Sequence, residues 1–195
     1  MKKKILIITA SARKTGNTVT VAKWVADGAR EGGAEVEIVD ATRVENKNNG
    51  CIGCRGCQKS DEYRCMVKDE TAQLVARMLE QDVVVLATPV YFGSFSAQLK
   101  RLIDRMYCLI KTREGAYSVA PELASVSMAF IATAGGDHDY GLGTASTHMK
   151  GIAAGLGKRV KQLLIPDAPP EPGELAKDAE TQKKSIAFGR ELAGQ

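Results

Sequence analysis

Four of the five cysteines in the chain lie within residues 51–65, with the spacing C-x2-C-x2-C-x7-C. Thiolates three residues apart, with a fourth close behind, can converge on one compact metal group, because a single loop can wrap around it. Gly53 and Gly56 lie between the first three cysteines and allow the tight turns that this requires. Arg55 and Arg64 would offset part of the negative charge of the thiolates. The spacing therefore indicates metal or redox chemistry.

Three other interpretations of these cysteines remain open. Four thiolates also form tetrahedral zinc sites, although zinc ribbons generally use two separated C-x2-C pairs. A redox disulfide, for example between Cys54 and Cys57, is the second alternative, and unreactive loop thiols are the third. The fifth cysteine, Cys108, falls in a segment with a helical apolar stripe, so we expect it to be a small buried residue.

Length and composition suit a single domain that spans residues 1–195. The formal charge is only +4, and acidic and basic residues alternate, which argues against a nucleic-acid-binding protein. The apolar run after the N-terminal lysines covers only residues 5–10, which predicts a first strand and not an export signal. No segment has the length of a membrane span. We therefore expect a cytoplasmic protein, where clustered cysteines favour metal or redox chemistry over structural disulfides.

Short apolar segments alternate with helical patterns along the chain. We predict strands over residues 4–9, 35–39, 82–87, 125–132 and 159–165, and helices over residues 17–31, 69–81, 96–112, 144–156 and 174–192. This alternation predicts an α/β fold, with an open, doubly wound parallel sheet between two helical layers. A phosphate-type turn after the first strand favours the flavodoxin-like strand order 2-1-3-4-5. Two further segments are the long loop 41–68, which carries the cysteines, and the C-terminal turn and helix, 166–195.

The turn after the first strand is rich in hydroxyl groups and leads directly into a helix. It reads S-A-R-K-T-G-N-T, so helix N-terminal N–H groups, hydroxyls and the Arg13 cation can hold an anion together. Neither G-x-x-x-x-G-K-[ST] nor G-x-G-x-x-G occurs, which excludes an NTPase P-loop and the usual dinucleotide fingerprint. The turn therefore fits the phosphate of a mononucleotide. An ordinary N-capped helix, with Asn17 and Thr18 as the capping pair, is the alternative.

Aromatic residues are scarce, yet three of them follow the third strand, in the segment T-P-V-Y-F-G-S-F-S. Tyr91, Phe92 and Phe95 would lie at the carboxyl edge of a central strand, where ligands of such sheets bind. Backbone N–H groups of this turn could address the nitrogens of a flat heterocycle. Aromatic packing beneath the next helix is the alternative.

The turn after the fourth strand is rich in glycine. Gly135 and Gly136 would let the backbone approach a ligand closely. His138 and Asp139 are close enough in sequence to reach the same edge of the sheet, but we expect His138 to be an exposed loop residue.

Taken together, S-A-R-K-T-G-N-T, T-P-V-Y-F-G-S and C-x2-C-x2-C resemble the NADPH-dependent FMN reductase superfamily and, within it, the iron–sulfur flavoproteins. The likeness extends from residue 4 to about residue 143 and includes S-A-Q-L-K-R-L-I-D-R, from Ser96 to Arg105. It implies a flavodoxin-like fold that binds FMN noncovalently. One departure is Ala12, where the family often has proline after the first serine.

By position, the resemblance assigns three sets of residues to FMN. They are Ser11, Arg13, Gly16, Asn17 and Thr18 for the phosphate, then Pro89, Val90, Tyr91, Phe92 and Gly93 for the isoalloxazine, then Thr133, Gly135 and Gly136 to complete the pocket. In iron–sulfur flavoproteins a compact four-cysteine motif holds a [4Fe–4S] cluster beside the flavin. The residues that match this motif are Cys51, Cys54, Cys57 and Cys65. We expect no catalytic acid or base, because the cofactors carry the chemistry.

Three hypotheses about function follow. In the first, the chain passes electrons between NAD(P)H or a ferredoxin-like protein and an acceptor through FMN and the cluster. In the second, it is an NAD(P)H-dependent reductase of free flavin, a quinone or another small acceptor, without a cluster. In the third, it is a non-catalytic module with a zinc-stapled loop for protein contacts, which would be colourless. The resemblance also implies a homodimer or homotetramer, with the flavin near a subunit boundary.

Overall fold

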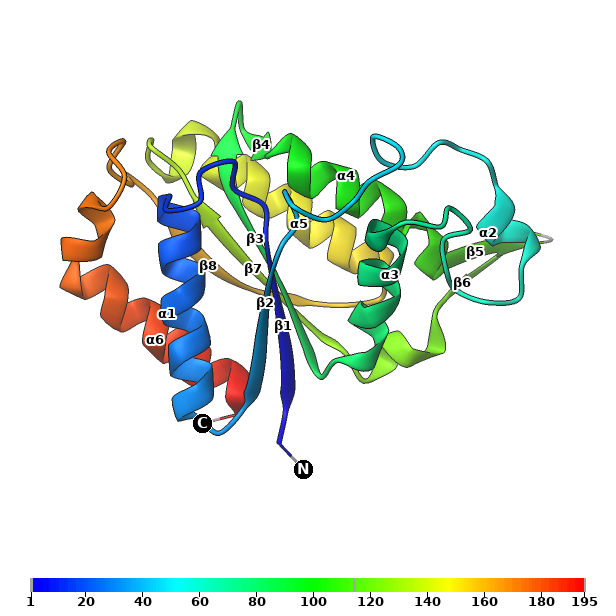
Figure 1. The fold of residues 1–195 in the computed structure, drawn as a ribbon, viewed down its shortest axis with the longest axis horizontal. Coiled ribbons are helices and arrows are strands. Elements are labelled where there is room, and N and C mark those ends of the chain that lie inside the picture. The colour runs from blue at the N-terminus through cyan, green and yellow to red at the C-terminus, as the bar shows by residue number, and fades with distance from the viewer. Residues whose placement is uncertain (1, 114, 195) are drawn as a thin grey trace.

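The computed structural model describes residues 2–113 and 115–194. Five parallel strands form the central sheet in the order β2-β1-β3-β7-β8 (Figure 1). They are β1 (Lys4–Thr9), β2 (Glu35–Asp40), β3 (Val83–Tyr91), β7 (Ser127–Thr133) and β8 (Val160–Ile165). A short strand, β4 (Ser94–Phe95), folds back antiparallel on the end of β3. The predicted flavodoxin-like fold and strand order are therefore confirmed.

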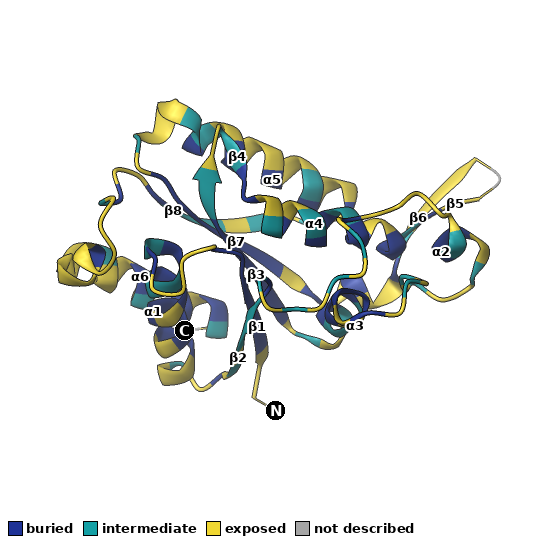
Figure 2. Cartoon of the chain, turned by 45° about the horizontal axis from the view of Figure 1, so that its top comes forward, coloured by how far each residue is buried: buried dark blue, intermediate teal, exposed yellow. Residues whose placement is uncertain are grey.

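Helices cover both faces of the sheet. Helices α1 (Asn17–Glu31) and α6 (Ala179–Ala193) lie side by side on one face (Figure 1). Helices α3 (Glu70–Arg77), α4 (Ala97–Arg105) and α5 (Gly143–Gly155) cover the other. Ile5 and Ile7 of β1 point into the first core, and Leu6 and Ile8 point into the second. This alternation explains why the central strands are buried along their length (Figure 2).

Glycines bring α1 and α6 into backbone contact. A Cβ on Gly28 would lie 2.0 Å from the Ile186 carbonyl oxygen, and a Cβ on Gly189 would lie 2.1 Å from the Val25 carbonyl oxygen. Only glycine fits at either position, so the two helices lock together without intervening side chains.

The predicted helix over residues 96–112 is wrong at its C-terminal end. Helix α4 ends at Arg105, a 3-10 turn covers Met106–Leu109, and an antiparallel hairpin follows, made of β5 (Ile110–Arg113) and β6 (Ala116–Val119). The apolar stripe of α4 is real, but β-branched Ile110 and Thr112 favour an extended chain, and Lys111 between them is buried. Tertiary contacts with the cysteine loop thus decide the local structure.

Three smaller predictions also need correction. The N-cap of α1 is Gly16, with no capping bond from a side chain, so Asn17 and Thr18 are not the capping pair. The predicted C-terminal helix is a 3-10 turn, Glu174–Lys177, followed by α6, because the carboxylate of Asp178 caps α6 by accepting from the Thr181 N–H. The predicted helix over residues 69–81 is α3 followed by a 3-10 turn, Met78–Glu80.

The long loop between β2 and α3 is ordered and contains one helical turn, α2 (Gly56–Lys59). It lies beside the hairpin β5–β6 at one end of the molecule (Figure 1). Among the described residues, none of the helices combines the length and apolar character needed to cross a membrane.

Candidate functional site

The turns after β1, β3 and β7 meet at the carboxyl edge of the sheet and are joined by buried hydrogen bonds. The hydroxyls of Thr18 and Thr133 lie 2.7 Å apart and link the first turn to β7. The Ser96 hydroxyl donates to the Ala10 carbonyl over 2.7 Å, and the Ser96 N–H donates to the Thr88 hydroxyl over 3.0 Å. These bonds fix the relative positions of the three turns, which is the arrangement that a ligand at this edge requires.

The turn after β1 offers free N–H groups to an anion. Gly16 has an extended backbone, and its N–H donates to the Arg13 carbonyl. In the part of the chain that the structure describes, the N–H groups of Thr15, Asn17 and Thr18 have no acceptor. Because they lie at the positive end of the 15-residue helix α1, they suit a phosphate.

The side chains predicted to hold the phosphate have other partners in this structure. Arg13 donates to the Pro170 carbonyl over 2.8 Å, and Asn17 donates to the Pro169 carbonyl over 2.7 Å. The Ser11 hydroxyl accepts from the Arg13 N–H over 3.3 Å. The turn after β8 is therefore tied to the phosphate turn, a contact that the sequence did not indicate.

A cavity of about 620 Å³ opens at the same edge, between the turns after β3 and β7. This volume suits a cofactor or small substrate. Among the predicted ring-binding residues, Pro89 and Thr133 are paired in register across β3 and β7. Neither of these two residues lines the cavity. The cavity is lined by six of the predicted residues, namely Val90, Tyr91, Phe92, Gly93, Gly135 and Gly136, and by Ala134, Asp139, Tyr140, Gly141 and Thr144.

The aromatic residues around this edge divide into two groups. Tyr91, Phe92 and Tyr140 are exposed around the cavity, and Phe92 has a positive φ of 48°. Phe95 is instead buried, with its ring centroid 5.6 Å from that of Phe130 and 4.7 Å from that of His148. For Phe95 the platform interpretation is therefore wrong, and the alternative of buried aromatic packing is confirmed.

The sequence interpretation missed Tyr140 and Gly141, which lie at a kink in the segment His138–Leu142, where both residues have non-helical backbone angles. A glycine-rich turn was their only signal. Asp139 lines the cavity, in agreement with the suggestion from the sequence that it could reach this edge of the sheet. His138 lies in a neighbouring hollow and is exposed, as expected.

The cysteines surround one small cavity in the loop after β2. Cys51 and Cys54 are exposed, Cys57 and Cys108 are buried, and all five cysteines are free thiols that line this cavity. Burial, followed by the proximity of Cys65 and Cys57, raises the pKa of Cys108 to about 12, so this thiol stays protonated. The expectation that Cys108 is a small buried residue is confirmed.

The cysteine loop is held in place by the hairpin that follows α4. Buried Lys111 donates to the carbonyls of Cys57, Ser60 and Glu62, the last two over 2.6 Å and 2.8 Å. The Gln58 side chain donates to the Ile110 carbonyl over 2.8 Å and accepts from the Thr112 N–H over 3.0 Å. The loop is therefore preorganised although it contains only one helical turn.

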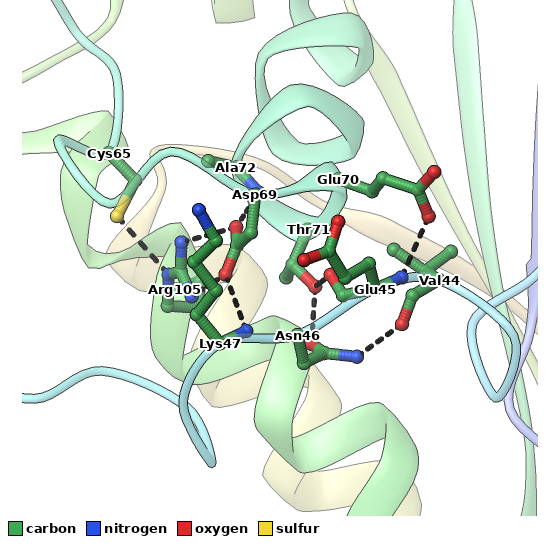
Figure 3. A network of polar contacts seen from close by, with 10 residues as sticks. All are labelled: Val44, Glu45, Asn46, Lys47, Cys65, Asp69, Glu70, Thr71, Ala72 and Arg105. Atoms are coloured by element: carbon green, nitrogen blue, oxygen red, sulfur yellow. Dashed lines mark hydrogen bonds and ion pairs between the residues drawn. The ribbon is translucent and has the colours of Figure 1, made fainter.

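A buried ion pair lies behind the fourth cysteine (Figure 3). The guanidinium of Arg105 donates to both carboxylate oxygens of Asp69, over 2.9 Å and 3.0 Å, and its Nε donates to Cys65 Sγ over 3.1 Å. Burial alone would raise the pKa of Asp69, but hydrogen bonds from Arg105, Ala72 and Lys47 outweigh it, so this pKa lies below its ordinary value. Burial would lower the pKa of Arg105, but bonds to Asp69 and Cys65 outweigh it and raise this pKa.

Comparison with known proteins identifies the class. The family model of NADPH-dependent FMN reductase matches residues 3–161. The chain therefore belongs to the NADPH-dependent FMN reductase family, whose members are oxidoreductases. This match confirms the predicted resemblance.

Two relatives illustrate the names that proteins of this class carry. An iron–sulfur flavoprotein of Methanocaldococcus jannaschii is 36% identical over 102 residues, which are 52% of this chain and 51% of that protein. An NAD(P)H dehydrogenase (quinone) of Archaeoglobus fulgidus is 39% identical over 107 residues, which are 52% of this chain and 50% of that protein. The chain thus spans about half the length of the curated relatives it matches.

Solved structures share the fold along the full chain. An NAD(P)H:quinone oxidoreductase from Methanothermobacter marburgensis has a TM-score of 0.75 at 17% identity, covering 100% of this chain and 98% of that one. An FMN-dependent NADH-azoreductase from Bacillus anthracis, solved with FMN, has a TM-score of 0.72 at 14% identity, covering 98% and 100%. At these identities the likeness concerns the fold.

The two sites differ in how completely they are formed. The sheet edge has a cavity of suitable size and free N–H groups, so its residues fit FMN. The cysteines offer four thiols around one cavity, which is the donor set of an iron–sulfur cluster. Within residues 2–113 and 115–194, however, no three His, Cys, Asp or Glu side chains lie close enough together to hold a metal ion. The sulfur atoms would have to converge when a cluster binds.

Proposed function

We propose that the chain is an FMN-dependent oxidoreductase of the iron–sulfur flavoprotein type. The observation that carries this proposal is the cavity at the carboxyl edge, which lies between the β3 and β7 turns and is joined by buried hydrogen bonds to a turn with free N–H groups. A mononucleotide needs both features, one for its ring and one for its phosphate.

In this proposal FMN binds with its phosphate at the N-terminus of α1. The N–H groups of Asn17 and Thr18 donate to phosphate oxygens, and Ser11 adds a hydroxyl. Arg13 and Asn17 exchange the carbonyls of the 169–170 turn for the phosphate. The ring lies in the cavity, where the N–H groups of the β3 turn address its nitrogens and the exposed aromatics exclude water from its face.

Bound FMN supplies the capacity to accept two electrons as hydride and to release them singly. The chain positions the ring and stabilises negative charge on its reduced form through backbone donors from Val90 to Gly93. No side-chain acid or base is assigned.

We also propose that Cys51, Cys54, Cys57 and Cys65 hold a [4Fe–4S] cluster that exchanges single electrons. The support is that these four thiols surround one cavity on a loop fixed by Lys111 and Gln58. The electron source is NAD(P)H or a ferredoxin-like protein, and the final acceptor is a small molecule. We further propose that the chain works in the cytoplasm. We also propose that it forms a homodimer or homotetramer, because exposed Phe92 and Tyr140 rim the cavity.

A second candidate is an NAD(P)H-dependent reductase of quinones or flavins that lacks the cluster. Two observations favour it. One is the relative named NAD(P)H dehydrogenase (quinone). The other is that the described residues do not bring three potential metal ligands together. A zinc-stapled binding module is not favoured, because the chain belongs to a reductase family.

Anaerobic purification with quantitation of FMN, iron and acid-labile sulfide tests the proposal. We expect one FMN per chain, and four iron and four sulfide per chain if the cluster is present. FMN without iron after anaerobic reconstitution would reject the cluster and leave the quinone reductase. Absence of FMN after reconstitution would reject both. Cys57→Ala should abolish iron binding and leave FMN in place, whereas Cys108→Ala should leave both.

A further inference from the structure

A buried cation in contact with a cysteine sulfur is not used by the FMN site. The Arg105 Nε lies 3.1 Å from Cys65 Sγ, and the side chains of Arg105 and Asp69 are only 1% and 0% exposed. A buried ion pair carries a large desolvation cost, so its contribution to folding stability alone is a weak reason for its presence. Its position against the sulfur offers a functional reason.

The ion pair is held rigidly from several directions (Figure 3). Asp69 is the N-cap of α3 and accepts from the Ala72 N–H over 2.9 Å. It also accepts from the Lys47 N–H over 3.1 Å, on the opposite arm of the cysteine loop. Because the carboxylate is fixed and binds both Nη atoms of Arg105, the guanidinium plane is fixed as well. Its Nε therefore points at one place, the sulfur of Cys65.

Cys65 needs such an anchor more than the other three cysteines do. Seven residues separate it from Cys57, whereas the first three cysteines follow one another at steps of three. Lys111 fixes the first group through the Cys57 carbonyl. Arg105 lines the same cavity as all the cysteines, and so fixes the distant one.

We propose that Arg105, oriented by Asp69, is a positioning residue that holds Cys65 Sγ as the fourth cluster ligand and raises the reduction potential of the cluster. This inference rests on the proposed iron–sulfur function. A hydrogen bond from a cation to a ligand sulfur stabilises the more negative, reduced state. On reduction one electron enters from the reduced flavin, or from dithionite in a titration, and no covalent bond forms or breaks.

The test compares reduction potentials in the full chain, reconstituted anaerobically with iron and sulfide. Arg105→Lys keeps a cation for Asp69 but lacks the planar fork that reaches both the carboxylate and the sulfur. A second variant, Arg105→Met with Asp69→Ser, removes both buried charges and retains a capping hydroxyl for α3. The matched control is Arg113→Gln, since Arg113 is an exposed cation that donates to the Gln58 carbonyl and to Asp61 on the same loop.

We expect the reduction potential of the cluster to be about 59 mV lower in Arg105→Lys and in the double variant than in the wild type. For a one-electron couple this shift is a roughly tenfold less favourable equilibrium constant for reduction. FMN content should not change, and Arg113→Gln should keep the wild-type potential. Loss of iron from Arg105→Lys, with FMN retained, would also support the positioning role. If the double variant does not fold, Arg105→Lys alone decides.

Two results overturn the inference and are distinguishable from each other. A wild-type chain with FMN but no iron rejects the proposed cluster, and this inference with it. A wild-type chain with iron, and Arg105 variants with unchanged iron and an unchanged midpoint, rejects the role of Arg105 alone.

Discussion

Gly93 and Gly141 approach each other backbone to backbone, where the turn after β3 meets the segment before α5. Both have positive φ, 71° and 95°. A Cβ on Gly141 would lie 3.0 Å from the Gly93 Cα and 3.3 Å from its nitrogen. The two turns that line the candidate flavin cavity therefore support each other through a contact that only glycine allows.

Gly141→Ala should weaken FMN binding and destabilise the fold. The added Cβ would meet the backbone of Gly93 and not a flexible side chain, and alanine would be strained at the positive φ of this position. We therefore expect a loss of about 1–3 kcal/mol in unfolding free energy. FMN affinity should fall about tenfold, because both turns must shift. Isothermal titration with FMN and chemical denaturation measure the two effects.

Gly151→Ala is the matched control for Gly141→Ala. Gly151 lies in the middle of α5, is exposed, and has open space around its Cβ position. Because alanine favours helix, the unfolding free energy of this variant should rise by about 0.5–1 kcal/mol, and its FMN affinity should stay unchanged. Equal FMN affinities in the two variants would contradict the supporting role of the Gly93–Gly141 contact.

The buried hydroxyl pair of Thr18 and Thr133 should show strong coupling. Thr18→Val or Thr133→Val leaves one hydroxyl buried without its partner, and each should cost about 1–3 kcal/mol. The double variant should be more stable than the sum of the two losses indicates, since no hydroxyl is then orphaned. A double-mutant cycle by urea denaturation measures this coupling, and simple additivity would contradict a direct bond.

Lys111→Met should release the cysteine loop without affecting the flavin cavity. It removes the ammonium group that binds three carbonyls of the loop at once, of which, among the described residues, only that of Ser60 keeps another donor, Arg113, so iron retention during chelator challenge should fall while FMN content stays constant. Lys59→Met, which removes an exposed cation from the same loop, is the control and should retain iron as the wild type does. Equal iron loss from both variants would show that net charge matters and the anchor does not.

The ion pair beneath Cys65 should make stability depend on pH in the acid range. The pKa of Asp69 is lower in the folded chain than in the unfolded chain, where it is about 3.9. Its contribution is therefore fully present above about pH 5 and is lost as the pH falls through the folded pKa. Unfolding free energies of wild type and Asp69→Asn should differ most near neutral pH, and the difference should shrink progressively as the pH falls below about 4. A difference that stays constant from pH 7 to pH 3 would contradict this linkage.

The sheet and its order could be predicted because each strand is a short apolar run between clear helix signals. β1 and α1 have the predicted bounds, and α1 ends directly before the Gly32-Gly33 pair, which is a clear stop signal. The hairpin β5–β6 was missed because its structure depends on contacts with a loop some fifty residues earlier in the chain, such as that of Lys111 with Glu62. No local pattern carries that information.

The candidate site was predictable in the same uneven way. Residues at strand ends, such as Val90 and Gly135, were found because parallel strands bring their carboxyl ends to one edge. Tyr140 and Gly141 were missed because a backbone kink before α5 places them there. Arg105 was missed because an arginine within an apolar stripe ordinarily lies at the surface, and only the fold shows that Asp69 neutralises it.

The cysteine loop and the hairpin belong to two different crossovers, one between β2 and α3 and the other between α4 and β7. The segment of the loop around the cysteines bonds to the hairpin through Gln58, which contacts Ile110, Thr112 and Arg113. The loop and the hairpin could thus be gained or lost together in evolution, without a change in the five-stranded parallel sheet. A chimaera that receives both the loop and the hairpin from another protein should bind the cluster of that protein. Exchange of only one of the two segments should leave the other without its hydrogen-bonding partners.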